Sequence, residues 1–180
     1  MYKIRNASIL VVIALLLVVS ALLVIGVVND EDRRADSVMK RVVKAVNSQD
    51  SETLEGMFSE KALNEVDDFG YDAARLFDLV DEKIVSWERA DHPYISRSIE
   101  YGRTTKKEVS LFYFVYTSTE KLFCLIDSVP IDKYNPDNVG FYLLLVVKAE
   151  EEEKIWDGKQ KILFDGRTSI PRYGVYIPFE

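Results

Sequence analysis

The sequence is poor in the residues that support metal and thiol chemistry. Its 180 residues include one cysteine, Cys124, and one histidine, His92. A single cysteine excludes an intrachain disulfide framework and a thiolate zinc site, and a single histidine excludes metal sites with several histidine ligands. The sequence also lacks a glycine-rich phosphate loop that ends in Lys-Ser or Lys-Thr, which excludes nucleotide hydrolysis of the common kind. We therefore expect no cofactor and no bound metal.

Basic residues are in the minority as well. The chain has 23 Lys and Arg against 30 Asp and Glu, which gives a net charge of −7. A nucleic-acid-binding protein needs a basic face to neutralise phosphates. We expect no nucleic-acid partner, and the acidic balance leaves a basic protein partner open.

A long apolar run is the strongest feature of the sequence. Residues 7–28 contain no charged side chain. As a helix this run would measure roughly 33 Å, which matches a bilayer core of about 30 Å. A cleaved signal peptide is the alternative, since Ser20 and Ala21 are small, but Leu22, Leu23, Val24 and Ile25 continue the run beyond them. We predict a short tail at 1–6, a transmembrane anchor at 7–28 and one domain at 29–180.

The charges that flank the apolar run set the expected orientation. Lys3 and Arg5 precede it, which favours a cytoplasmic N-terminus. More basic residues follow it within 33–44, but they alternate with acids and belong to a folding domain, and long domains cross membranes largely regardless of charge. We therefore predict a single-pass protein of the cell membrane with its C-terminal domain outside.

The pattern of apolar residues predicts an α+β fold for that domain. Residues 32–46 carry apolar side chains at helical spacing, and shorter helices are expected after Asp50 and over 72–80. Apolar alternation then indicates strands at 83–88, 96–103, 107–119, 121–128 and 139–148, with a turn at 104–106. The charge run 150–153 is typical of a solvated loop, and 170–178 of packed irregular chain or an edge strand. Helices followed by strands favour helices packed on a bent antiparallel sheet.

Several short motifs resemble known families. The segment 45–50 with Leu54 and 57–59 resembles the opening of cone-shaped domains related to nuclear transport factor 2, in the cystatin-like superfamily. The segments 100–103, 135–142 and 174–178 resemble a family of uncharacterised bacterial lipoproteins known only as a domain of unknown function. The resemblance covers about 37–178 and implies a cone fold with no established activity. Unlike those lipoproteins, this chain has no cysteine to acylate near the end of the apolar run, because its one cysteine is Cys124.

The side chains that could carry chemistry, those of His92, Cys124 and the acidic loop 132–138, are better explained by structural roles. His92 lies in a turn-like Asp-His-Pro tripeptide with no nearby nucleophile, and Cys124 lies in the middle of an apolar strand. The loop that holds Asp132, Asp137 and Asn138 lacks the late glutamate of a calcium loop, so turn preference explains it. We assign no catalytic, cofactor-binding or metal-binding residue.

Function is therefore expected to be binding. A cone can enclose an apolar cavity, and Trp87, Tyr113 and Tyr142 are the possible pocket residues because aromatic side chains with a polar tip suit such sites. We predict a membrane-tethered extracytoplasmic binding or accessory domain for an unknown small ligand or protein. One alternative is an acidic interaction or protective protein for a basic partner such as a toxin. Another is an isomerase-like cone enzyme that uses a carboxylate base and a tyrosine oxyanion donor.

Overall fold

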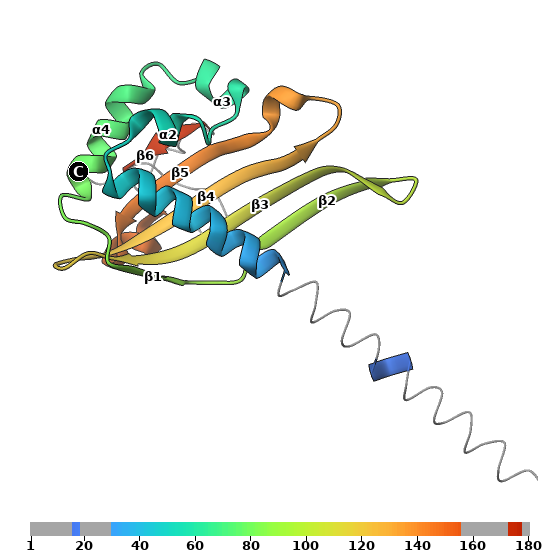
Figure 1. Ribbon diagram of the computed structural model, residues 1–180, viewed down its shortest axis with the longest axis horizontal. Coiled ribbons are helices and arrows are strands. Elements are labelled where there is room, and N and C mark those ends of the chain that lie inside the picture. Colours follow the sequence, from blue (N-terminus) through green and yellow to red (C-terminus); the bar gives the residue numbers. More distant parts are fainter. Residues whose placement is uncertain (1–15, 19–29, 156–172, 178–180) are drawn as a thin grey trace, which may run out of the picture. The chain divides into compact units, whose positions relative to one another are not determined.

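The computed structural model describes residues 16–18, 30–155 and 173–177 (Figure 1). The chain divides into two compact units, Met1–Val38 and Met39–Glu180. In the first unit, residues 30–38 are helical, and Asp30 pairs with Arg34 at 2.9 Å on the exposed surface. Most of the predicted anchor at 7–28 lies outside the described residues. Within the described ones, no helix combines the length and the apolar character needed to cross a bilayer.

The second unit is built on a six-stranded sheet in the order β1-β3-β4-β5-β6, with β2 also paired to β3. The strands are β1 (Ser86–Arg89), β2 (Tyr94–Glu100), β3 (Arg103–Tyr116), β4 (Lys121–Asp132), β5 (Gly140–Lys148) and β6 (Gly174–Tyr176). The predicted α+β class is confirmed, but the sheet is mixed rather than antiparallel, because β6 pairs parallel to β5. A parallel pair needs a crossover of about a dozen residues or more, and residues 149–173 provide that length.

Several element boundaries differ from the prediction, and the turn before β3 is one of them. The hairpin turn between β2 and β3 lies at Tyr101 and Gly102, not at 104–106. Both residues have positive φ angles, 49° and 74°, as tight two-residue hairpin turns require, and glycine adopts such angles without steric cost. Another difference is at 150–153, where the charge run forms part of the 3-10 helix η2 (Ala149–Ile155) instead of a solvated loop, and Ile155 at its end is buried.

The helices begin at the polar residues expected of N-caps. The first helix covers residues 30–47 and is followed by α2 (Ser51–Glu55), α3 (Glu60–Asn64) and α4 (Phe69–Leu79). Asp50 accepts a hydrogen bond from the Thr53 amide at 2.8 Å, and Ser59 accepts one from the Ala62 amide at 3.1 Å. Such caps satisfy amides that the first turn of a helix leaves unpaired.

One face of the sheet packs against helices (Figure 1). Residues 39–47 place Met39, Val42 and Val46 toward it, all at most 5% exposed. Only about 20 Å³ remains free among these side chains and their partners on α4 and the strands, so this core is filled. Asn47 joins the end of this helix to the segment before β1, because its side-chain amide donates to the carbonyl of Ile84 at 3.0 Å and accepts from the Ile84 amide at 2.8 Å.

The opposite face of the sheet carries a second apolar cluster. It joins buried side chains of the central strands to the end of η2, namely Phe123, Leu125, Leu143, Leu145, Val147 and Ile155. Strands β4 and β5 are therefore covered on both faces, which explains their nearly continuous apolar sequence. Strand β3 keeps Phe112 and Phe114 only partly buried against this cluster.

Candidate functional site

A groove lies on the sheet face that carries this second cluster. Its volume is about 710 Å³. The apolar floor is the half-buried Phe112 of β3, which packs against the cluster that holds Phe123 and Leu125 of β4, each only 1% exposed. Residues 90–94 and Glu152 of η2 form the walls. This combination of an apolar floor and a few polar groups is typical of small-molecule sites.

The wall at 90–94 exists because β1 and β2 pair with the same edge of β3. Strand β1 pairs with β3 as far as Tyr113, and β2 begins opposite Ser110, so the residues between them leave the ladder. Pro93 has no amide to donate to a ladder. Ala90 is still held to the edge of β3, since its amide donates to the carbonyl of Phe112 at 2.9 Å. The loop is therefore anchored beside the aromatic floor.

The groove is acidic. Three carboxylates line it, from Asp91, Asp127 and Glu152, and none of its described lining residues is Lys or Arg. Burial raises the pKa of Glu152, the neighbouring Glu153 raises it further, and Lys121 lowers it. These charges favour a ligand with a positive group.

The histidine that the sequence interpretation set aside lies on the wall of this groove. His92 is exposed, and its amide donates to the side chain of Asp91 at 2.6 Å. The Asp-His-Pro sequence predicts a turn, and this tripeptide does leave the ladder. What the sequence did not indicate is that this turn stands over Phe112 and Phe123 from two other strands.

The three predicted pocket residues lie in different environments. Tyr113 is 1% exposed and lies opposite Cys124 in the sheet. Trp87 is half-buried opposite Val115 on the edge strand β1. Tyr142 is half-buried and lines a small hollow of about 70 Å³ beside Tyr173. The large groove has none of these three among its described lining residues.

The two remaining candidates for chemistry are part of the folded framework. Cys124 is 2% exposed, and burial raises the pKa of its thiol to about 12. Asp132 organises the loop before β5: its carboxylate accepts from the side chain of Asn138 at 2.9 Å and from the amides of Asn135 and Tyr134. These hydrogen bonds hold its pKa below the ordinary value. In the part of the chain that the structure describes, no group of His, Cys, Asp and Glu is arranged to hold a metal ion.

The fold and groove define an α+β domain with a mixed sheet, helices on one face and an acidic, apolar-floored groove on the other. Residues 41–149 match the model of a domain of unknown function, DUF5104. The match covers more than half of the chain, so the protein belongs to this family. No curated protein sequence matches the chain.

Proposed function

We propose that the protein is a membrane-tethered binding domain whose groove takes a small ligand with an apolar body and a positively charged group. The groove carries this proposal, because its volume of about 710 Å³ lies within the range of small-molecule sites. The half-buried Phe112, backed by the buried cluster of Phe123 and Leu125, suits the apolar body. Asp127 and Glu152 suit the charged group.

The tether and the cone fold belong to the same proposal. The uncharged run at 7–28 supports a single-pass anchor, and Lys3 and Arg5 support a cytoplasmic N-terminus with the domain outside. Helices followed by a strongly paired sheet support a cone related to nuclear transport factor 2. In this proposal, however, the ligand occupies the face away from the helices, because the space beneath them is filled.

The binding proposal is tested with two dyes of opposite charge. Berberine, a cationic aromatic dye, should bind the full-length chain in detergent micelles with saturable fluorescence, and the anionic dye ANS should bind more weakly. Asp127→Asn should weaken berberine binding about tenfold, as expected for a lost charge-assisted contact, and leave ANS unchanged or stronger. Phe112→Ala should weaken both dyes.

A matched control separates the groove from general surface adhesion. Tyr71 is an aromatic residue of α4 that is 63% exposed and is not among the described residues of the groove. Tyr71→Ala should leave both dyes unaffected. Equal berberine affinity in the parent, Asp127→Asn and Phe112→Ala chains would show that the groove is not a binding site.

The tether is tested on intact cells. Protease added outside should digest the domain, and the mature protein should still begin at or near Met1. A domain that stays protected from the protease until the cells are lysed would show that the orientation is the opposite one. A mature chain that begins beyond Ala21 would show that the apolar run is a cleaved signal peptide and not an anchor.

A further inference from the structure

The turn between β2 and β3 and the loop beside it display large, mostly exposed side chains. Ile99 is 63% exposed and Tyr101 is 103% exposed, and Tyr134 of the next loop is 67% exposed. The hydroxyl of Tyr134 donates to Glu100, and the amide of Lys133 donates to the carbonyl of Thr105 at 2.9 Å. These contacts join the two loops into one surface, which we call the hairpin tip and define as residues 99–103 with 133–134.

The backbone conformation at position 101 is energetically unfavourable for tyrosine. Its φ of 49° lies in the left-handed region, which bulky residues rarely adopt and which asparagine or glycine adopts more readily in such turns. Its side chain is fully exposed, so packing within the fold does not compensate for that conformation. Residues that are unfavourable for their backbone conformation, and large apolar side chains left exposed, occur mainly at functional sites.

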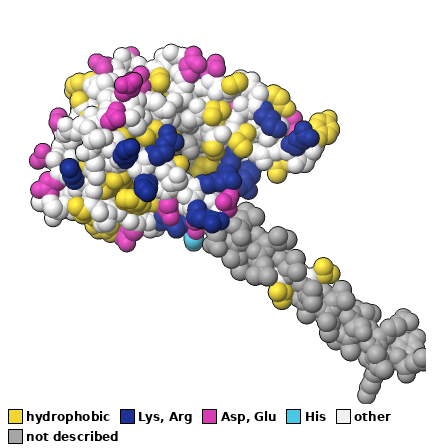
Figure 2. All heavy atoms as spheres, in the orientation of Figure 1, with side chains coloured by type: hydrophobic (Ala, Val, Ile, Leu, Met, Phe, Trp, Pro, Cys, Tyr) yellow, Lys and Arg dark blue, Asp and Glu magenta, His cyan; other side chains and the backbone are white. Residues whose placement is uncertain are grey.

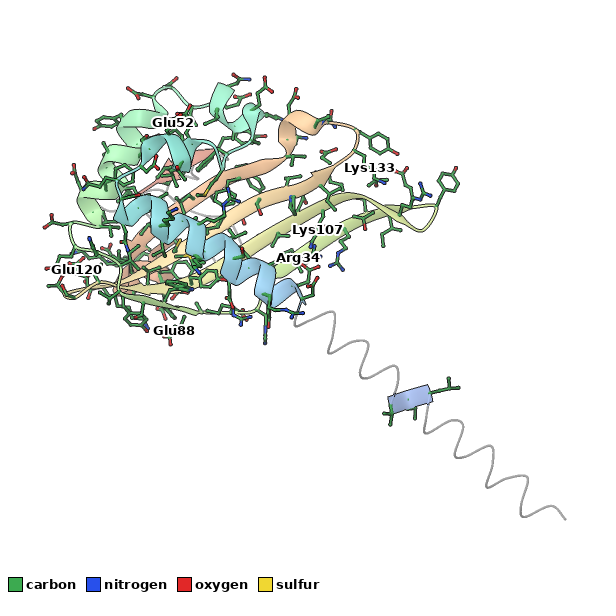
Figure 3. All side chains as sticks on the ribbon, viewed as in Figure 1. Arg34, Glu52, Glu88, Lys107, Glu120 and Lys133 are labelled. Atoms are coloured by element: carbon green, nitrogen blue, oxygen red, sulfur yellow. The ribbon has the colours of Figure 1, made fainter. Side chains whose placement is uncertain are left out.

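The hairpin tip is basic although the chain as a whole is acidic. Arg103 and Lys133 belong to it and Arg97 lies just before it, all three exposed. The one acid within the tip, Glu100, accepts the Tyr134 hydroxyl. Figure 2 shows hydrophobic and basic side chains together over this projecting end of the molecule, and Figure 3 labels Lys133 beside it.

The shape of the hairpin tip favours a flat or soft partner. From Ser96 to Glu100 every residue of β2 is exposed, so neither face of this part of the strand is covered. Figure 1 shows the β2–β3 hairpin projecting past the loop between β4 and β5. The hairpin tip is narrow and convex (Figure 1). Its exposed tyrosines and basic side chains are the residue types that proteins place at the headgroup level of bilayers.

We propose that the hairpin tip inserts Tyr101 and Ile99 among the headgroups of an anionic bilayer, while Arg97, Arg103 and Lys133 contact lipid phosphates. The proposal rests on the tether proposed above. Residues 29–38 between the proposed anchor and the second unit could extend at most about 35 Å, so the domain stays near the bilayer. The hairpin tip would then restrict how the tethered domain is oriented.

Tryptophan fluorescence tests this contact in the full-length chain. Tyr101→Trp and the control Tyr71→Trp, whose parent residue is also well exposed, are reconstituted into vesicles that contain brominated lipids. The emission added by Tyr101→Trp should be quenched in vesicles of phosphatidylglycerol and phosphatidylcholine, and much less in phosphatidylcholine alone or at high salt. The emission added by Tyr71→Trp should not be quenched in either.

Two outcomes would overturn the proposal. Emission from Tyr101→Trp that stays unquenched in anionic vesicles would mean that the hairpin tip faces water, and a protein partner would then account for its exposure. Equal quenching at positions 71 and 101 would mean a non-specific collapse of the domain onto the lipid.

A second variant separates binding from folding. Tyr101→Asn should leave the unfolding temperature unchanged or raise it, because asparagine tolerates the left-handed turn. In the same chain, a tryptophan at position 134, introduced as Tyr134→Trp, should lose its quenching by anionic brominated lipid when Tyr101→Asn is added. Quenching that persists would show that Tyr101 is not part of the lipid contact and would overturn its proposed insertion.

The tether is scored separately by alkaline extraction of the vesicles. A chain that resists extraction but shows no quenching at position 101 retains the tether and refutes the tip contact. A chain that is extracted, yet shows quenching that depends on anionic lipid before extraction, refutes the tether and retains the tip contact.

Discussion

Gly140 offers a sharp test of how the helical layer is attached to the sheet. Its φ is 138°, and a Cβ added there would lie 2.6 Å from the amide nitrogen of Ser59 and 2.8 Å from the carbonyl carbon of Phe58. The connection between α2 and α3 passes this point as a parallel bridge from Phe58 to Phe141. Since the obstructing atoms are backbone, no side-chain rotation relieves the clash.

The expected cost of Gly140→Ala follows from these contacts. The backbone conformation alone costs alanine about 1–3 kcal/mol. Moving the connection endangers two hydrogen bonds of 2.8 Å each, from the Ser59 amide to the Phe141 carbonyl and from the Phe141 amide to the Met57 carbonyl. At about 0.5–1.5 kcal/mol for each bond, the total loss in the free energy of unfolding should be about 4 kcal/mol.

Gly102→Ala is the matched control. Gly102 also has a positive φ, 74°, but nothing lies within 4 Å of an added Cβ. It should cost only about 1 kcal/mol, from the backbone conformation. Denaturant unfolding of the full-length chains in detergent micelles, followed by near-ultraviolet circular dichroism, measures both. Equal losses at the two glycines would refute the close attachment of the α2–α3 connection to β5.

Three further predictions concern the core, the thiol and the loop. Val42→Asp should lower the free energy of unfolding by about 3 kcal/mol or more, because Val42 is 2% exposed. Lys44 is exposed, so Lys44→Asp should change this free energy by about 0.5 kcal/mol or less. Equal unfolding midpoints for the two variants would contradict the packing of residues 39–47. Cys124 should resist a thiol-specific reagent at pH 8 until the chain is unfolded, because burial raises its pKa to about 12, and labelling of the folded chain at the unfolded rate would contradict this. The pKa of Asp132 is lower in the folded chain than its ordinary value of 3.8, so its stabilising effect is present above that pH and is lost as the pH falls through the folded value. The stability difference between the parent and Asp132→Asn chains should therefore shrink between neutral pH and about pH 3, and a constant difference would show that the charge of Asp132 does not matter.

The sequence alone determined the elements whose periodicity is strong. The helical spacing of Met39, Val42 and Val46 predicted the buried stripe of the first helix, and these side chains are buried in the structure. The alternation in 107–119 and the apolar run after it predicted an antiparallel hairpin, which β3 and β4 form, and the run at 139–148 predicted a further strand, which is β5. Periodicity succeeds here because a helix or strand half covered by a core repeats its burial at a fixed interval.

Local sequence was less informative where two conformations compete. The turn was expected at 104–106 but lies at Tyr101 and Gly102. Tyrosine is not a residue that usually occupies a left-handed turn position, so turn preferences pointed elsewhere. The acidic run before Ile155 looked like a solvated loop, but burial of that one apolar side chain is associated with a 3-10 helix there.

The groove depended on tertiary structure alone. Phe112 and Phe123 lie on the paired strands β3 and β4, His92 is in a loop that leaves the ladder, and Glu152 follows β5 in η2. No periodicity in the sequence links these four residues, because a groove is assembled by strand register and by loops that leave the sheet. The sequence by itself determined which segments become helices and strands and which of their faces are apolar. The sequence already favoured helices packed on the sheet, but only the tertiary structure decided that an acidic groove opens on the opposite face, since the groove depends on contacts between residues far apart in the chain.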